Sequence, residues 1–426
     1  MKVLFVTPVE QGSGETITCL HLAEGLRDKG HDVLFLASAF AAGFLRSQFP
    51  TQIRDLGHDG SANRSMWDSV LAEFRPDVVV FADYPLLFFE AGAAPLALEP
   101  GWCESLESLP ASLVTLDHFG FAQKEMGMYF GPSHLSFHYQ KFPAIPRRMN
   151  ILLPCPMHEP GPVSGRRGYP FRYWNLPFEQ SEFSRSEVRS RYLDNEDDFL
   201  VFHTVPNWAC GQAERMGLFL YRHLGKVLDY YLRDLPRPVT VVSVNNGSLL
   251  QAPSESGIRI VNLKPVSRVE FEGFLLHSDL VLTENSVSIA MGKAICFVRP
   301  CAVMRNSFTF REAVDRSDGP IRDLVLQMEH ERMGAIFPFN VYPIGMVHEL
   351  EQIILYRDNS LTAAFRPLEI FGGTETKRQL YNLLTDDRER EALKTAQLEY
   401  VRRLLQIGDG ADVLQEIVDN ERASDL

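Results

Sequence analysis

The first forty residues alternate between continuous apolar runs and one amphipathic segment. Residues 3–6 form an unbroken apolar run, which is typical of a strand buried on both faces. A mostly polar loop with two glycines covers residues 7–14, a helix with an apolar side follows it, and Gly30 marks its end. Residues 33–36 form a second apolar run. Strand, helix and strand with short links make a βαβ unit, so the pattern predicts a parallel sheet.

The same rhythm occupies both halves of the chain. In the first half it predicts a helix over 65–74 and strands over 77–82 and 113–116. In the second half it predicts strands over 199–205, 239–244, 258–263, 279–282 and 295–298, and a helix over 212–232. Between them, residues 119–185 lose the rhythm and are rich in proline, glycine and aromatic residues, which favours an ordered interdomain segment or an acceptor-side wall over a disordered linker. Charged helices follow residue 374. We therefore predict an α/β protein of two Rossmann-like domains with parallel sheets.

Composition excludes some classes of function. The net charge of −13 argues against nucleic acid, whose backbone is bound by Lys and Arg. The six cysteines include no CxxC pair and no zinc spacing, so we expect a reducing, cytoplasmic environment and no metal. The apolar start of the chain is too short for a signal peptide, and no apolar stretch reaches 18 residues, so no membrane span is expected.

Two turns have the composition of anion sites. Gly12, Ser13 and Gly14 lie between the first strand and the first helix, and Asn285 to Ser288 follow the predicted strand 279–282. Backbone N–H groups at such turns, with the partial positive charge of the helix start, attract anions. In doubly wound sheets ligands bind beyond the carboxyl ends of the strands, where both turns would lie.

The first half also resembles a known family. Gly12-Ser13-Gly14-Glu15, then Leu22-Ala23 and Gly30-His31-Asp32-Val33, resemble the opening of the GT-B glycosyltransferases of the antibiotic, glucuronosyl and lipid-II types. The resemblance places Glu15 where this family often carries a catalytic histidine. It implies the GT-B fold, with two domains facing each other across a cleft and C-terminal helices crossing back to the first domain.

The second half resembles the donor domain of the same family. Residues 206–209, which include Asn207, look like its first strand-to-helix loop, and Lys264 with Pro265 looks like the segment that holds the nucleobase. Residues 274–283 resemble its helix-then-strand element. The positions near the donor that the resemblance implies are Gly12, Ser13, Gly14, Asn207, Lys264, Pro265, Glu284, Asn285, Ser286, Ser288, Arg299 and Arg305. Glu284 to Ser288 stand where the family has His-Gly-Gly and Ser or Thr, and the two arginines flank Pro300, near the donor sugar.

These resemblances imply a division of labour along the chain. Residues 1–180 would form the acceptor-side domain, 181–373 the nucleotide-sugar-binding domain, and 374–426 the helices that pack back on the first domain. The implied activity is sugar transfer from a nucleotide-sugar to a small-molecule acceptor, without metal, in natural product biosynthesis.

Transfer with inversion needs a base for the acceptor hydroxyl. Glu15 is one candidate, and His118, which with Asp117 follows the predicted strand 113–116, is the other. With Glu15 in the first loop the roles could be swapped, so that His118 is the base and Asp117 or Glu15 orients it. Asp83 ends another strand and is a weaker alternative.

Two other classes of function remain open on the same scaffold. One is a nucleotide-sugar epimerase, and the other is a non-catalytic binding or activator protein of glycosyltransferase ancestry, because fold does not fix function. The nucleotide, the sugar, the acceptor, the stereochemistry and the oligomeric state, a homodimer included, are not fixed by the sequence.

Overall fold

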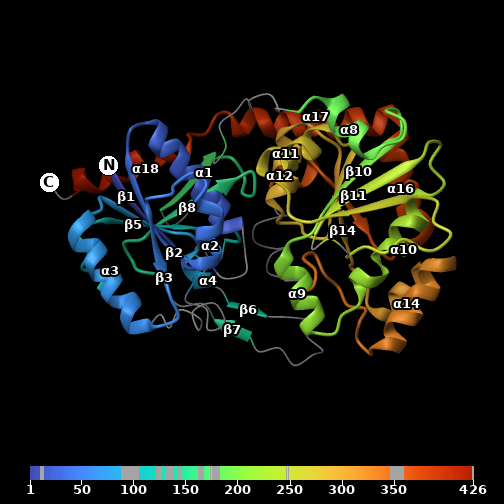
Figure 1. The fold of residues 1–426 in the computed structure, drawn as a ribbon, viewed down its shortest axis with the longest axis horizontal. Helices are drawn as coiled ribbons and strands as arrows, with labels where there is room; N and C mark the ends of the chain where they lie inside the picture. Colours follow the sequence, from blue (N-terminus) through green and yellow to red (C-terminus); the bar gives the residue numbers. More distant parts are fainter. Residues whose placement is uncertain are drawn as a thin grey trace. The chain divides into compact units, whose positions relative to one another are not determined.

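The computed structural model describes residues 1–9, 14–87, 105–120, 122, 127–129, 139–141, 145–161, 167–172, 174, 183–245, 247, 249–345 and 359–424. The chain forms two compact units (Figure 1). The first comprises Met1–Met128, Tyr139–Phe178 and Arg403–Leu426, and the second comprises Tyr129–His138 and Glu179–Arg402.

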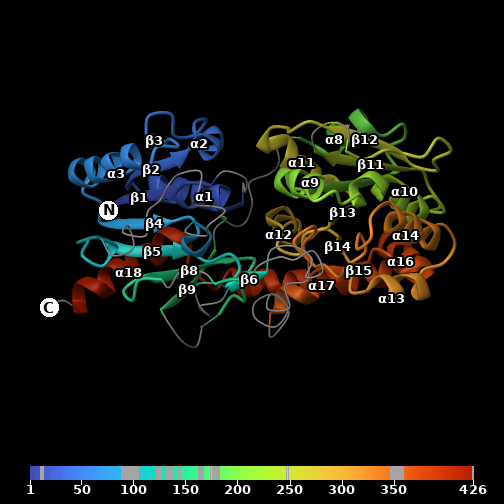
Figure 2. The same ribbon diagram turned by 90° about the horizontal axis from the view of Figure 1, so that it is seen from below.

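The first unit is built on a seven-stranded sheet in the order β3-β2-β1-β4-β5-β8-β9 (Figure 2). Its described strand pairs are parallel. The strands are β1 (Lys2–Thr7), β2 (Asp32–Ser38), β3 (Ile53–Leu56), β4 (Val78–Phe81), β5 (Ser112–Leu116), β8 (Asn150–Cys155) and β9 (Gly168–Arg172). The helices are α1 (Gly14–Asp28), α2 (Ala39–Leu45), α3 (Gly60–Phe74), α4 (Tyr84–Leu87) and α18 (Gly410–Ser424). The short strands β6 (Gly127–Tyr129) and β7 (Tyr139–Lys141) form a separate sheet.

The last helix belongs to the core of this first unit. Figure 1 shows α18, in red, beside the blue α1, and α18 also packs on β9. The approach is close, since a Cβ added at Gly410 would lie 2.4 Å from a methyl carbon of Leu22. Glycine is therefore required at the start of α18, where the C-terminal segment crosses back to the first unit.

The second unit is built on a six-stranded sheet in the order β12-β11-β10-β13-β14-β15, again with parallel pairs. The strands are β10 (Phe199–Thr204), β11 (Val239–Val244), β12 (Arg259–Leu263), β13 (Leu280–Thr283), β14 (Cys301–Arg305) and β15 (Arg366–Glu369). The helices are α8 (Arg185–Tyr192), α9 (Asn207–Arg215), α10 (Leu220–Leu232), α11 (Arg268–His277), α12 (Ile289–Cys296), α13 (Phe310–Arg316), α14 (Gly319–Glu331), the 3₁₀ turn η3 (Ser360–Ala363), α16 (Gly373–Thr385) and α17 (Asp387–Leu404).

The predicted fold class is confirmed: both halves are Rossmann-like, with parallel sheets. The predicted strand at 295–298 is wrong, because that apolar run ends the buried helix α12 and the strand begins at Cys301. The predicted helix over 212–232 is two helices, separated at Gly217, whose φ is +63°. Helix α16 packs on α10 and α14 within the second unit, so residues 374–402 belong there, and the segment that returns to the first unit begins at Arg403.

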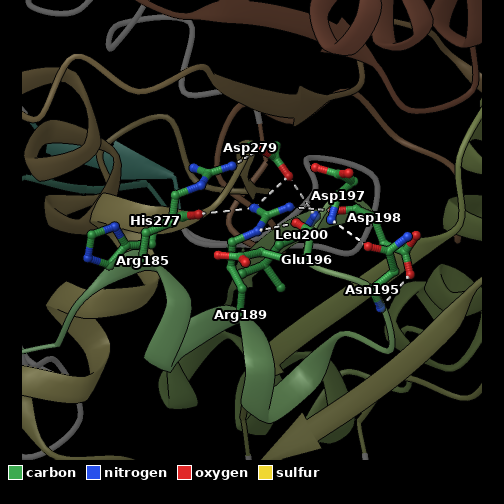
Figure 3. Close-up of polar contacts among 9 residues, drawn as sticks. All are labelled: Arg185, Arg189, Asn195, Glu196, Asp197, Asp198, Leu200, His277 and Asp279. Carbon is green, nitrogen blue, oxygen red and sulfur yellow. Dashed lines mark hydrogen bonds and ion pairs between the residues drawn. The ribbon is translucent and has the colours of Figure 1, made fainter.

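A buried arginine ties α8 to the amino edge of the second sheet (Figure 3). Arg189 is 1% exposed, and its Nη1 lies 3.0 Å from Oδ2 of Asp279. The guanidinium also donates to the carbonyl oxygens of Glu196, His277 and Asp198. The same Asp279 oxygen accepts the N–H of Leu200 at 2.8 Å, so α8, β10 and the start of β13 meet at this point. The acidic run at 196–198 thus uses its backbone to hold Arg189.

Candidate functional site

Ionisable side chains gather at the carboxyl edge of the first sheet. Asp83 follows β4, Asp117 and His118 follow β5, and His158 follows β8. Glu15 stands in the first turn of α1, at the same edge. Parallel strands bring their carboxyl ends together, so residues far apart in the sequence meet there.

Hydrogen bonds fix the orientation of His118. Its Nε2 lies 3.0 Å from Oγ1 of Thr18, and the Thr18 hydroxyl lies 3.0 Å from the carbonyl oxygen of Gly14. Both bonds form at once only if Thr18 donates to Gly14 and His118 donates to Thr18, which assigns the proton to Nε2. The other nitrogen, Nδ1, faces Oδ2 of Asp83 at 3.7 Å. The imidazole is therefore oriented through Nε2 and is only 5% exposed.

The electrostatics couple Glu15 to this imidazole. Burial raises the pKa of Glu15 above its usual value, the nearby Asp83 adds to that, and His118 opposes it. Burial lowers the pKa of His118, and the charges of Glu15 and Asp117 oppose that shift. A half-buried carboxyl group of raised pKa thus stands beside a buried imidazole that is neutral at neutral pH.

Asp117 orients the loop more than it orients the imidazole. Its Oδ2 accepts the N–H of Ala122 at 3.1 Å, and its backbone oxygen lies 2.5 Å from Nε2 of His158. Burial lowers the pKa of His158 to about 4, so this second imidazole is neutral and donates its Nε2–H to the carbonyl. The sequence pointed to Glu15, Asp117 and His118 but missed Thr18 and His158. Thr18 follows Glu15 by three residues, which places both on one face of α1.

Of the predicted glycine loop, Gly12 and Ser13 lie outside the described residues. Gly14 is described: it begins α1, and its carbonyl oxygen accepts the Thr18 hydroxyl.

The predicted donor residues of the second unit occupy different edges of its sheet. Asn207 begins α9 after β10, Lys264 and Pro265 are exposed after β12, and Asn285, Ser286 and Ser288 follow β13, all at the carboxyl edge. Arg305 ends β14 at the same edge, and its Nε lies 3.1 Å from Oε1 of Glu369. Arg299 precedes β14, so the structure places it at the amino edge, away from the other predicted donor residues.

Two buried hydroxyls at the carboxyl edge have no hydrogen-bond partner in the described part of the chain. They are Oγ1 of Thr204, at the end of β10, and Oγ of Ser286. Thr204 is paired in register with Thr283, so the two hydroxyls come from neighbouring strand ends. Ser288 is already used, since its Oγ accepts the N–H of Met291 and caps α12. Thr204 was missed by the sequence reasoning, although a polar residue that closes an apolar strand signals such a position.

Glu284 is drawn into the interior. Its side chain is 2% exposed, and its Oε1 accepts Nε2–H of His203 at 2.8 Å. His203 lies within β10 and is fully buried.

Two absences apply to the described residues only. They contain no group of three or more His, Cys, Asp or Glu side chains arranged to hold a metal ion. Nor do they include a helix with the length and apolar character needed to cross a membrane.

The fold is shared with solved glycosyltransferase structures. The spinosyn forosaminyltransferase SpnP matches with a TM-score of 0.54 and 13% identity, over 98% of this chain and 99% of that chain. The glycosyltransferase VinC in complex with DTDP matches with 0.53 and 12%, over 98% and 99%. The spinosyn rhamnosyltransferase SpnG complexed with thymidine diphosphate matches with 0.51 and 14%, over 98% and 100%. At this identity the likeness shows the fold, which is GT-B.

Sequence comparison gives a family without an assigned activity. No curated protein matches the chain. One family model covers residues 22–422, from the first helix to the last. The chain therefore belongs to the family of unknown function DUF6365.

Proposed function

We propose that this protein transfers a glycosyl group from a nucleoside-diphosphate sugar to a small-molecule acceptor. The observation that carries the proposal is the placement of Glu15, in the first turn of α1, with the oriented imidazole of His118 at the carboxyl edge of the first sheet. A carboxylate of raised pKa beside an oriented imidazole is suited to take a proton from a hydroxyl near neutral pH.

In the proposed reaction Glu15 is the base. The acceptor oxygen forms a bond to the anomeric carbon, the bond from that carbon to the diphosphate oxygen breaks, and Glu15 takes the hydroxyl proton. The nucleoside diphosphate leaves with the electron pair. Glu15 is preferred over His118 because its side chain is the more exposed of the two, and because the free lone pair of His118, on Nδ1, faces Asp83. His118 acts on Glu15 through its charge: when the imidazole is protonated, it favours the ionised carboxylate.

The donor is assigned to the second unit. The hydroxyls of Thr204 and Ser286 would donate to diphosphate oxygens, which are the acceptors that these buried groups lack in the described residues. Helix α9 begins beside them after Pro206, without a side-chain cap, so its first N–H groups also face that site. Lys264 and Pro265 would lie near the nucleobase of the donor. Because SpnG and VinC were solved with thymidine diphosphate or DTDP, thymidine diphosphate is the first probe to use.

The donor assignment is tested with one buried serine against another. Ser286→Ala should weaken thymidine diphosphate binding by roughly 10- to 150-fold and spare thymidine, since a hydrogen bond to a charged group contributes about 1.5–3 kcal/mol. Ser278→Ala is the matched control: its hydroxyl is also buried without a described partner, but it precedes β13 at the amino edge. Calorimetry should measure the affinity of both variants for thymidine diphosphate. Equal affinities in the two variants would reject the assignment.

The base is tested by single-turnover assays of nucleoside diphosphate release. Glu15→Gln should bind donor normally and lose about 10²–10⁴-fold in rate. His118→Ala should lose less if Glu15 is the base, and more if the roles are swapped. Full activity in both variants would remove the catalytic pair from the mechanism.

A further inference from the structure

A continuous chain of side-chain hydrogen bonds crosses four neighbouring strands of the second sheet. It runs from Asn262 on β12 through Asn245 and Ser243 at the end of β11 and His203 on β10 to Glu284 after β13. The successive donor–acceptor distances are 2.8, 2.9, 2.8 and 2.8 Å. All members except Asn262 are buried.

Backbone N–H groups fix the direction of this chain. Gly247 donates its N–H to Oδ1 of Asn245 at 2.7 Å, and Leu250 donates its N–H to Oδ1 of Asn262 at 3.0 Å. The amide nitrogen of Asn245 must therefore face Oγ of Ser243.

The rest of the chain follows from that first assignment. The Ser243 oxygen accepts from Asn245, and we assign its own proton to the bond with Nδ1 of His203. The ring proton of His203 then lies on Nε2 and is donated to the carboxylate of Glu284. In this arrangement every hydrogen bond of the network is made with one donor and one acceptor.

The two ends of the chain hold the two loops that the proposed function assigns to the donor. At one end, the side chains of Asn245 and Asn262 bond the backbone of Gly247, Leu249 and Leu250, in the loop after β11. A Cβ added at Gly247 would lie 3.3 Å from the side chain of Lys264, so this loop abuts the segment expected near the base.

At the other end, Glu284 opens the segment that contains Ser286. Its backbone oxygen accepts the N–H of Tyr342 at 3.1 Å, and its carboxylate is held by His203. The loop assigned to the nucleobase and the loop assigned to the diphosphate are thus joined through buried polar atoms.

The hydrogen-bond network buries polar side chains in an apolar part of the second unit, and this burial costs free energy. Val201 and Val205, two positions before and after His203 along the strand, belong to the apolar core. Burying four polar side chains in such a layer is unfavourable unless their hydrogen bonds are made, whereas apolar side chains would carry no such cost.

We propose that His203 is a positioning residue for the donor, and that through Ser243 and Glu284 it aligns the nucleobase-binding loop with the diphosphate-binding loop. It touches neither part of the donor. The inference rests on the proposed function of the second unit. Its signature is a gain in affinity that appears when nucleoside and diphosphate are joined in one molecule.

Two conservative variants interrupt the hydrogen-bond network on opposite sides of His203. The amide of His203→Asn reaches about as far as Nδ1, so it keeps the bond to Ser243 and loses Glu284. The amide of His203→Gln reaches about as far as Nε2, so it keeps Glu284 and loses Ser243. Ser243→Ala removes the central link without changing the imidazole.

Calorimetry on the full chain should compare thymidine, inorganic pyrophosphate and thymidine diphosphate, with the uridine compounds as a second series. We expect each variant to bind the nucleoside and pyrophosphate as the wild type does, and the nucleoside diphosphate about 2- to 30-fold more weakly, the range of measured couplings through side-chain networks. ¹⁵N NMR of the His203 ring, assigned by its loss in His203→Gln, should show the proton on Nε2.

Three outcomes would overturn the inference. Equal loss for all three ligands, with a lower melting temperature, would mean a structural role alone. If the variants bind the nucleoside diphosphate as tightly as the wild type does, the coupling is rejected and the proposed function still stands. Failure of the wild type to bind either nucleoside diphosphate would reject the donor assignment and the inference with it.

Discussion

Replacing Arg189 should destabilise the second unit more than any exposed substitution nearby. Arg189→Met keeps most of the side-chain volume but removes every donor of the guanidinium (Figure 3). The carboxylate of Asp279 loses its buried partner, and three carbonyl oxygens lose a donor. Removing one partner of a buried pair costs about 3–5 kcal/mol. Asp279 keeps partial solvent access and its contact with Arg185 at 3.4 Å, so we expect the lower end, about 3 kcal/mol.

Hydrogen exchange followed by mass spectrometry measures this loss within one unit, which a single melting curve of a two-unit chain would not. A loss of about 3 kcal/mol corresponds to roughly 10²-fold faster exchange in peptides that span α8 and β10, including the Leu200 amide bonded to Asp279. Peptides from β1 and β4 in the first unit serve as the internal reference, and their exchange should not change.

Arg185→Met is the matched control. Arg185 lies on the same helix and faces the same carboxylate, but its side chain is 49% exposed and its contact is longer. An exposed pair of this kind contributes about 0–1 kcal/mol. If Arg189→Met accelerates exchange no more than Arg185→Met does, the contacts of Arg189 do not stabilise the amino edge of the sheet and the reasoning fails.

Three further predictions concern the first unit. Gly410→Ala should destabilise it by about 1–3 kcal/mol in urea titrations because the new Cβ meets Leu22, whereas Gly25→Ala, with open space around its Cβ, should stabilise α1 by about 1 kcal/mol. Glu15→Gln should raise the melting temperature at pH 7: a raised folded-state pKa means that the stability contributed by Glu15 is present at low pH and is lost as pH rises through that pKa, so the advantage of Gln should vanish near pH 4. His158, with a pKa of about 4, should show no NMR titration between pH 5 and 8, and a midpoint inside that range would mean that the ring is not buried as described.

The fold could be predicted because continuous apolar runs and short glycine turns identify parallel strands locally. Two features of the fold could not be predicted. Strands β8 and β9 lie in the proline-rich segment 119–185, where the apolar rhythm is lost; Pro170 stands in β9, the edge of the sheet, where proline is tolerated. The apolar run near 295–298 lacks a period that separates a buried helix from a buried strand, and only the packing of α12 decides between them.

The candidate site was predictable only where one motif or one strand end carries it. Glu15 and His118 were predicted in this way, the first from its spacing and the second from its place after a strand. The pairing of His203 with Glu284 depends on how β10 and β13 are aligned, with Thr204 opposite Thr283, and a single sequence contains no such register. The resemblance likewise placed both Arg299 and Arg305 near the donor sugar, whereas they lie at opposite ends of β14.

The environment of Glu15 explains how a carboxylate could serve where the resembling family often has an imidazole. In the first turn of a helix, a carboxylate is normally favoured in its charged form, which would make it a weak base. Here burial and the neighbouring Asp83 outweigh that effect and raise the pKa of Glu15, while the burial of His118 keeps the imidazole neutral. The same two functional groups are therefore present with exchanged positions: the raised pKa makes Glu15 a stronger base, and the lowered pKa keeps the imidazole of His118 neutral. A direct replacement of Glu15 by His, without changes at Thr18 and Asp83, would bring two imidazoles together and remove the carboxylate. We infer that the exchange is a property of the whole cluster and that Glu15 and His118 are interpretable only as a pair.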